Sequence, residues 1–134
     1  QMYSTDASIY SMEPIGVVLP RTNEDVSNII KIAYKNNVSI LPRGGGTGLS
    51  GQTVNHSIVI DFSKYMHRII DMNPEEKWVK TQPGITIDQL NTNLKKYNLF
   101  FTPDPSTTSR ANVGGALGNN SCGAHSVVYG KTVD

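Results

Sequence analysis

The residues best suited to chemistry in this chain lie in a glycine-rich segment. Glycine fills four of five consecutive positions and recurs shortly afterwards: Gly44, Gly45, Gly46, Gly48 and Gly51. Glycine costs roughly 0.5–1 kcal/mol relative to alanine inside regular structure, so this cluster needs a reason. Without Cβ atoms, successive backbone N–H groups can form a concave nest for an anion, and a diphosphate suits such a nest. The alternative is an ordinary flexible loop in which the glycines only punctuate the chain.

Side chains within and beside this segment add further binding groups. Thr47 and Ser50 supply hydroxyl donors on either side of Leu49. Arg43 comes immediately before the first glycine and could pair with phosphate oxygens. It could equally brace the loop through a carboxylate.

The same segment contains the pattern G-x-G-x-x-G from Gly46 to Gly51, which is the dinucleotide fingerprint of the Rossmann fold. In that fold the pattern opens a helix whose N-terminus holds the pyrophosphate. Residues 52–57 show no helical period, and an acidic residue is expected about 20 positions further on. Asp61 comes too early for that role and Asp71 too late. We therefore interpret the match as accidental, and no Walker-type Gly-Lys-Ser/Thr follows it.

A second unusual segment lies further along the chain. Prolines stiffen its first part, Pro103-Asp104-Pro105, and residues 113–124 alternate glycine with small polar side chains. A short helix beginning at Gly114-Gly115 could direct free N–H groups at a ligand. The polar side chains of residues 119–121 could then satisfy the edge of a ring system. A crowded packing site that admits only small residues explains the composition equally well.

Apolar runs and helical periods predict the elements that position these segments. Strands are expected at residues 17–20, 38–41, 57–62, 67–71, 78–82 and 99–101. Capping-box spacing, Thr22 with Asp25 and Thr86 with Gln89, predicts two helices, which end near residues 36–37 and 98. The first strand, helix and strand form a βαβ unit, so its strands are expected to be parallel. Residues 103–120 are otherwise expected to be loop.

The composition fits a globular protein of one domain or two small subdomains, at 134 residues with 37% hydrophobic and 17% charged residues. Lys and Arg number 12 against 11 Asp and Glu, without runs of like charge, so nothing indicates a nucleic-acid partner. No stretch approaches about 18 continuous apolar residues, so we expect no transmembrane segment.

Single residues add little to the chemical picture. Cys122 is alone, which excludes an internal disulfide and makes a reducing, cytoplasmic compartment the default, with peripheral membrane association left open. We expect it to be a small buried residue, although it could be reactive or bond covalently to a bound ligand. Trp78 and Tyr97 are expected in the core. Three histidines show no ligand spacing, so no metal site is expected: His56, His67 and His125.

Four motifs together resemble the FAD-linked oxidases of the vanillyl-alcohol oxidase and para-cresol methylhydroxylase (PCMH) type. They are Pro42–Gly51, Gln82–Thr86, Pro103–Ser106 and Val113–Ala124. Within that family the chain is most similar to the branch of D-lactate, glycolate and D-2-hydroxyglutarate dehydrogenases. Residues 119–124, followed by Tyr129-Gly130, resemble large members that carry iron–sulphur modules. The resemblance covers roughly residues 5–134.

The resemblance implies an α+β fold, that of the PCMH-type FAD-binding domain. A small βαβ-containing first subdomain precedes a second subdomain with an antiparallel sheet, and FAD lies between them. We place a lead-in at residues 1–16, the first subdomain at 17–75 and the start of the second at 76–134. The family's domain is longer than this chain, so we expect a fragment that alone binds FAD poorly.

The resemblance also implies which positions contact the cofactor. The glycine loop would wrap the FAD pyrophosphate, and Gln82 and Gly84 would lie near the cofactor. The motifs from Pro103 onward would line the flavin and its ribityl chain. No histidine lies in the loop, so we expect non-covalent FAD. No residue is expected to be catalytic, because the family's catalytic bases lie in a substrate-binding domain. The expected cofactor-binding residues are Arg43, Gly44, Gly45, Gly46, Thr47, Gly48, Leu49, Ser50, Gln82, Gly84, Pro103, Asp104, Gly114, Gly115, Asn120, Ser121, Gly123 and Ala124.

The resulting hypothesis is the FAD-binding portion of an oxidoreductase. The flavin would take a hydride from a small 2-hydroxy acid and pass electrons to an acceptor through parts outside this chain, which could include an iron–sulphur cluster. Two other classes stay open. One is a non-catalytic module that binds a nucleotide or another phosphate-bearing ligand. The other is a Rossmann-type NAD enzyme, which the missing helix after Gly51 disfavours.

Overall fold

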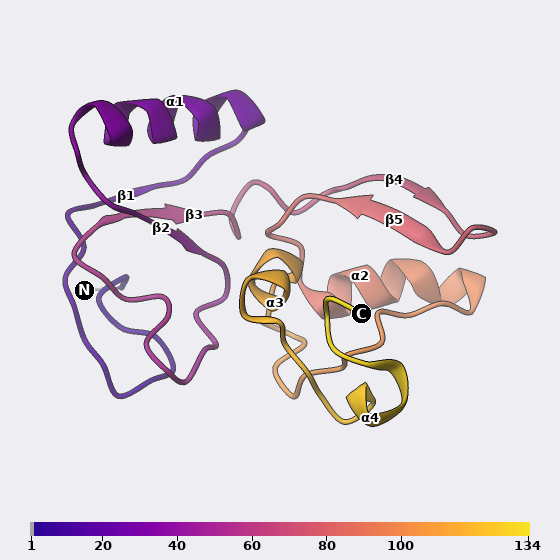
Figure 1. The fold of residues 1–134 in the computed structure, drawn as a ribbon. Coiled ribbons are helices and arrows are strands. Elements are labelled where there is room, and N and C mark those ends of the chain that lie inside the picture. Colours follow the sequence, from indigo (N-terminus) through magenta and orange to yellow (C-terminus); the bar gives the residue numbers. More distant parts are fainter. Residues whose placement is uncertain (1) are drawn as a thin grey trace. The chain divides into compact units, whose positions relative to one another are not determined.

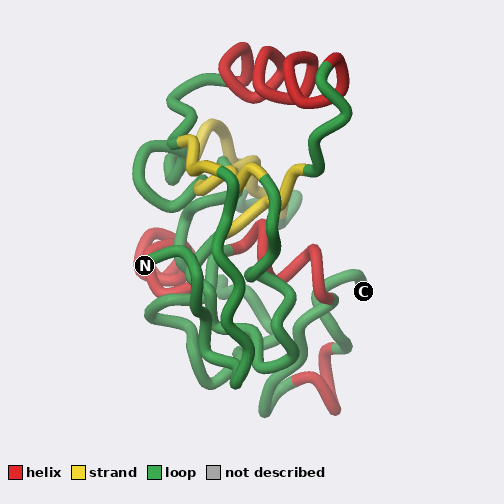
Figure 2. The backbone as a smooth tube through the Cα atoms, turned by 90° about the vertical axis from the view of Figure 1, so that its left-hand side faces the viewer, coloured by secondary structure: helices red, strands yellow, loops and turns green. Residues whose placement is uncertain are grey.

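The computed structural model describes residues 2–134. The chain divides into two compact units, Gln1–Met66 and His67–Asp134. Both units combine strands with helices, in agreement with the expected α+β class. Much of the chain is loop, drawn green in Figure 2. Among the described residues, each helix is too short or too polar to cross a bilayer.

The first unit is built on a three-stranded parallel sheet. Its strands are β1 (Gly16–Val18), β2 (Ile40–Arg43) and β3 (Ile58–Asp61), in the spatial order β1-β3-β2. β1 and β2 each pair with β3 in parallel, which confirms the parallel direction expected of the first strand–helix–strand unit. Because β3 lies between the other two, it is the most buried strand, with Val59 and Ile60 at most 1% exposed.

Helix α1 (Asn23–Lys35) lies over one face of this sheet (Figure 1). The predicted capping box is present: Asp25 N donates to Thr22 Oγ1 at 3.1 Å, and Thr22 N donates to Asp25 Oδ2 at 2.9 Å. The helix buries Ala33 and ends at Asn36, and Asn37 follows in the left-handed region with a φ of 54°. A short polar side chain tolerates that conformation, which explains why the two asparagines stop the helix.

The second unit begins with an antiparallel hairpin of β4 (Ile69–Asn73) and β5 (Trp78–Thr81). This hairpin spans residues 75 and 76, where the sequence patterns placed the start of the second subdomain. The pattern of each strand could not show that the two strands pair with one another. Pairing keeps both strands in one unit, so the division of the structure falls earlier, after Met66.

Helix α2 (Ile87–Leu94) follows the hairpin and is capped by Thr86 and Gln89, as predicted. A 3-10 turn, η1 (Lys95–Tyr97), continues it to Asn98, where a φ of 56° ends the helical path. The apolar face of α2 contributes Leu90 and Leu94 to the core of this unit. Hydrophobic residues of the hairpin and of the following segment pack against that core: Ile69, Val79, Leu99, Phe101 and Val113.

The last part of the chain differs from its expected structure. Residues 99–101 form no strand, because Phe101 N donates to the side chain of Asn91 at 2.7 Å instead of joining a sheet. Residues 103–120 are not all loop, since α3 (Val113–Asn119) forms where the Gly114-Gly115 turn had suggested a short helix. Helix α4 (Ser126–Tyr129) was not predicted. Its valines are largely exposed, so they follow no core-facing period.

Three expectations of burial are also wrong. Trp78 is 44% exposed and Tyr97 40% exposed, because both lie at edges of the hairpin and of the 3-10 turn rather than in the core. Cys122 is exposed as a free thiol, since it follows the left-handed end of α3 at Asn120 in a surface segment. Size and hydrophobicity alone did not place these side chains.

Candidate functional site

The glycine loop, residues 44–51, leaves the end of β2 and reaches β3 without forming a helix. The Rossmann arrangement therefore does not apply, as the sequence indicated. Within residues 2–134, the backbone N–H groups from Gly44 to Leu49 donate to no protein acceptor. Ser50 N, the next in line, donates to Gln52 Oε1 at 3.1 Å. Successive unpaired N–H groups are the feature that lets such a loop hold an anion.

Gly46 is required by the shape of this loop. Its φ is 64°, in the left-handed region that side chains rarely adopt. A Cβ at this position would also lie 2.8 Å from Nη2 of Arg43. A larger residue would therefore strain the backbone and displace the arginine together.

Arg43 braces the loop through backbone carbonyls. Its guanidinium donates to the carbonyl oxygens of Tyr3 at 3.4 Å, Thr5 at 2.8 Å and Thr53 at 3.0 Å. The sequence left open a pairing with phosphates or a brace through a carboxylate. The brace is present, although carbonyl oxygens take the place of the carboxylate. A direct contact of Arg43 with phosphate stays a prediction.

In the second unit, the Gln82–Gly84 turn lies against the start of α3. Gly114 N donates to Pro83 O at 2.9 Å, and a Cβ at Gly114 would lie 2.6 Å from Pro83 Cβ. The carbonyl of Gly84 accepts from Asn112 Nδ2 at 2.5 Å. Glycine is thus needed at position 114 because the two backbones approach closely. Asn112 Oδ1 is buried here without a hydrogen-bond partner among the described residues.

Gln82 is held within the protein. Gln82 is only 8% exposed, and its Oε1 accepts a hydrogen bond from Arg68 N at 3.0 Å. Its own backbone N donates to Arg68 O at 2.8 Å. These bonds fix the end of β5 and the turn that follows. A contact of Gln82 with a cofactor stays a prediction.

The Pro103-Asp104 turn packs against residues 121–126. A Cβ at Gly123 would overlap the backbone carbonyls of Pro103 and Asp104, so only glycine fits. Ser126 Oγ accepts from Gly123 N at 2.9 Å and donates to Pro103 O at 3.4 Å. Asp104 has a φ of 46°, an unusual conformation for a residue before proline. Such strain persists only where the surrounding structure holds it in place.

The remaining predicted residues of the second unit lie in α3 and in the segment that follows it. Asn120 Oδ1 accepts from Val133 N at 3.1 Å, and the Ser121 hydroxyl bonds to Asn119. Gly115 and Ala124 are exposed, and a Cβ at Gly115 would meet open space. Close packing therefore explains Gly114 and Gly123 but leaves Gly115 unexplained. The packing explanation of residues 113–124 is thus supported at Gly114 and Gly123, and ligand binding stays a prediction that could account for Gly115.

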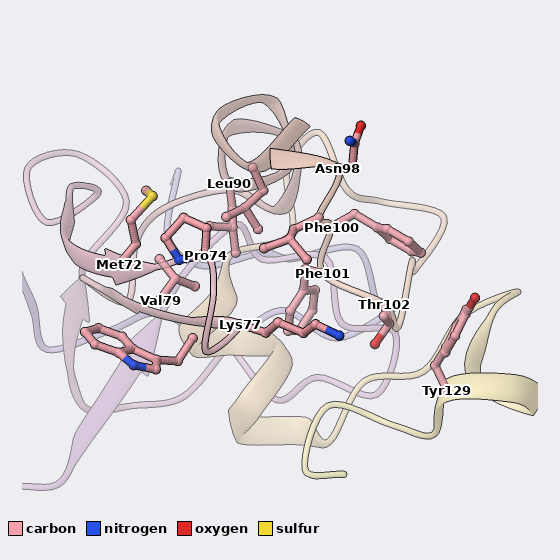
Figure 3. Close-up of a pocket in the computed structure, with 13 residues that line it drawn as sticks. Met72, Pro74, Lys77, Val79, Leu90, Asn98, Phe100, Phe101, Thr102 and Tyr129 are labelled. Carbon is pink, nitrogen blue, oxygen red and sulfur yellow. The ribbon is translucent and has the colours of Figure 1, made fainter. Parts of the chain in front are cut away.

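A pocket of about 500 Å³ lies elsewhere in the second unit (Figure 3). It opens between the hairpin, the end of α2 and residues 98–102, with Tyr129 at its edge. Its lining is mainly apolar, and it contains none of the residues predicted to bind a cofactor. Ligand sites usually combine an apolar wall with a few converging polar groups. The described residues contain no cluster of three or more potential metal ligands either.

Comparison with known proteins places this geometry in a family. The protein-family model described as "FAD binding domain" matches residues 14–134 of this chain. The chain is 48% identical to the D-2-hydroxyglutarate dehydrogenase of Escherichia coli (strain K12), covering 98% of this chain and 13% of that protein. It is 36% identical to the glycolate oxidase subunit GlcD of Bacillus subtilis (strain 168), covering 99% of this chain and 29% of the subunit.

A solved structure supports the same assignment. An alkyldihydroxyacetonephosphate synthase superposes with a TM-score of 0.79 at 29% identity, over 88% of this chain and 22% of the synthase. The chain thus spans only a small part of the proteins it resembles. The family model matches most of the chain, and the relatives carry the same assignment. This chain therefore belongs to the FAD-binding domain family of the FAD-linked oxidases.

Proposed function

We propose that this chain is the FAD-binding part of an oxidoreductase that oxidises a 2-hydroxy acid. The main structural support is the glycine loop, whose backbone N–H groups from Gly44 to Leu49 have no hydrogen-bond acceptor within residues 2–134. The substrate class is supported by the relatives named D-2-hydroxyglutarate dehydrogenase and glycolate oxidase, since both names denote a 2-hydroxy acid.

The residues present fit an anionic dinucleotide. The unpaired N–H groups match the negative charge of a pyrophosphate, and the left-handed Gly46 keeps a side chain from intruding. Thr47 and Ser50 would add hydroxyl donors. Bound FAD would supply a hydride acceptor, while this chain would hold and orient it. The absence of histidine from residues 43–51 supports non-covalent binding.

The second unit would contribute two groups of contacts. The first group would comprise the Gln82–Gly84 turn together with Gly114 and Gly115. This grouping is supported by the close approach of the Gly114 backbone to Pro83. Pro103 and Asp104 with residues 120–124 would form the other, with the packing of Gly123 as support. Both would line the flavin ring and its ribityl chain.

The electron acceptor and the catalytic residues belong to parts of the protein outside this chain. An iron–sulphur cluster there is supported by the similarity of residues 119–124 and of Tyr129-Gly130 to iron–sulphur-fused members of the family. The expected cytoplasmic compartment is part of this proposal and rests on the single cysteine.

The test uses the full-length protein, purified without denaturants. We expect a flavin absorption band, release of FAD on heating, and loss of that band when D-2-hydroxyglutarate, glycolate or D-lactate is added without oxygen. Protein free of flavin would contradict the proposal. Flavin that no 2-hydroxy acid reduces would contradict the substrate class and favour a non-catalytic module.

A matched pair of variants tests the pyrophosphate assignment. Gly46→Val adds a branched side chain at a φ of 64° and should remove FAD from the purified protein. Gly16→Val adds the same side chain at a glycine of β1 where a Cβ would meet no atom within 4 Å, and it should leave the flavin content unchanged. Full FAD content in Gly46→Val would contradict the role of the loop.

A further inference from the structure

The chain's first residues make contacts with the glycine loop that their sequence did not suggest. The family model begins at residue 14, so residues 2–13 precede the matched domain. They contain little regular structure, apart from an antiparallel bridge between Thr5 and Ser11. The bridge and a bond from Met12 N to Ser4 O at 2.9 Å fold this segment back on itself. We call residues 2–13 the arm.

The arm supplies acceptors for the brace at the start of the glycine loop. Arg43 Nη2 donates to Thr5 O at 2.8 Å, and Nη1 donates to Tyr3 O at 3.4 Å. The Arg43 guanidinium also lies over the Tyr3 ring, with Cζ 5.4 Å from the ring centroid. Of the guanidinium's hydrogen bonds within residues 2–134, the one to Thr53 O at 3.0 Å would be left without the arm.

The arm also bonds the far end of the loop. Asp6 Oδ2 accepts from Thr53 Oγ1 at 2.9 Å and from Thr53 N at 3.3 Å. Tyr10 lies against Gly51, where a Cβ would approach the ring to 2.7 Å. The loop is therefore held on both sides of its glycines by one short segment.

A third contact reaches the middle of the loop. Ala7 N donates to Gly46 O at 3.0 Å. The peptide unit is planar and trans, so its C=O and the following N–H point in opposite directions. Fixing the carbonyl of Gly46 toward the arm therefore directs the N–H of Thr47 away from it. That N–H is one of the donors left free for an anion.

The arm is itself anchored to the sheet. Tyr3 OH donates to Asp61 Oδ2 at 2.8 Å, and Asp61, at the end of β3, is only 7% exposed. β3 is the central strand of the sheet, so the arm ties the glycine loop to the strand that pairs with both of the others. A loop with many glycines loses much freedom when it is ordered, and ordering before binding reduces that cost to affinity.

We propose that the arm holds the glycine loop in the shape that receives the FAD pyrophosphate, with Asp6 and Arg43 as its positioning residues. This inference rests on the proposed function, because the anion is taken to be the pyrophosphate of FAD. It extends the cofactor site to a segment that precedes the family's domain.

The first test measures FAD binding to full-length apo-protein. Asp6→Ala should weaken FAD binding at least about tenfold, which corresponds to about 1.4 kcal/mol. Asp6→Asn keeps one oxygen acceptor for Thr53 and should restore part of the affinity. Ile9→Ala is the matched control, because Ile9 belongs to the arm and is 94% exposed. Equal affinities of Asp6→Ala and Ile9→Ala would overturn the proposal.

The second test does not depend on the cofactor. Trypsin cleaves after arginine, so release of the peptide ending at Arg43 reports how firmly the guanidinium is held. In native full-length apo-protein, we expect Asp6→Ala to be cleaved there at least about tenfold faster than the wild type, as for a tenfold change in the population of the opened loop. Ile9→Ala should be cleaved at the wild-type rate.

The two tests separate the two hypotheses. Wild-type protein that carries no FAD would contradict the proposed function, and the cleavage rate would still decide whether the arm holds the loop. Wild-type protein that carries FAD, with unchanged binding and cleavage in Asp6→Ala, would overturn the arm alone. Retained affinity after deletion of residues 1–13 would overturn it as well.

Discussion

Nδ1 of His125 lies 3.0 Å from Oδ2 of Asp104. The backbone of the same Pro103-Asp104 turn packs against Gly123, where a Cβ would not fit. Asp104 keeps a left-handed φ of 46° before Pro105. The His125 ring also meets the Phe100 ring edge-on at a centroid distance of 6.2 Å, and it lies tilted against the Tyr129 ring at 6.5 Å. Two segments of the second unit are thus joined by the His125–Asp104 contact, by aromatic contacts and by close backbone packing.

Gly123→Ala should destabilise this junction. The added Cβ would overlap the carbonyls of Pro103 and Asp104, and backbone atoms cannot move aside as a flexible side chain can. Overpacking of this kind typically costs about 1–3 kcal/mol. Gly115→Ala is the control, because its Cβ would meet open space inside α3, where alanine is the better helix former. Urea unfolding of full-length protein compares the two, and equal midpoints would contradict the packing.

His125→Ala should change stability much less than Gly123→Ala. The side chains of His125 and Asp104 are 53% and 42% exposed, and exposed ion pairs contribute about 0–1 kcal/mol. The expected shift in the urea midpoint is correspondingly small. A loss as large as that of Gly123→Ala would show that the pair, and not the close packing, holds the turn.

Tyr3 should make the first unit sensitive to alkaline pH. Burial, and then the hydrogen bond to the Asp61 carboxylate, raise the pKa of Tyr3 above its ordinary value of 10.0. A group whose pKa is raised on folding stabilises the fold fully below its unfolded pKa, and the contribution is lost as pH rises through the folded pKa. Stability should therefore fall above about pH 10, where unfolded tyrosine ionises.

Tyr3→Phe tests that expectation. The variant lacks the ionisable hydroxyl, so its stability should change less than that of the wild type between pH 9 and 11. Tyr34→Phe is a suitable control, because Tyr34 is 88% exposed on α1. An alkaline loss of the same size in the wild type and in Tyr3→Phe would exclude the Tyr3–Asp61 bond as its cause.

Thr22→Ala should weaken the start of α1. The hydroxyl of Thr22 accepts from Asp25 N, and removal of an N-cap acceptor costs about 1 kcal/mol. Thr22→Ser keeps the acceptor and should be close to the wild type in thermal unfolding of the full-length protein. A Thr22→Ser variant as unstable as Thr22→Ala would point to the lost methyl group instead.

The features that the sequence predicted well are local ones. Both capping boxes depend on residues three positions apart, and both formed as expected. The glycine loop could be identified from composition alone, because a cluster of glycines marks a segment whose backbone turns tightly or is approached closely. The insertion of β3 between β1 and β2 depends on pairing between distant residues, which no single pattern records.

The missed features depend on contacts between distant parts of the chain. The bond from Ala7 to Gly46 and the pair of Asp104 with His125 leave no periodic signal in the sequence. The strand expected at residues 99–101 was lost to a side-chain acceptor, Asn91, that competes with sheet pairing. Resemblance to a family identified the cofactor but could not assign a role to residues that precede the matched domain.

The central position of β3 also limits the order in which the first unit can fold. β1 and β2 do not pair with each other, so neither gains a sheet partner until Ile58–Asp61 is available. During synthesis, the ribosome must therefore release the whole glycine loop before any strand of this sheet can pair. Closing a parallel pairing across such a distance is slow, because loop entropy is lost before contacts compensate for it. The segment proposed to grip the cofactor is thus also the connection whose closure starts the sheet.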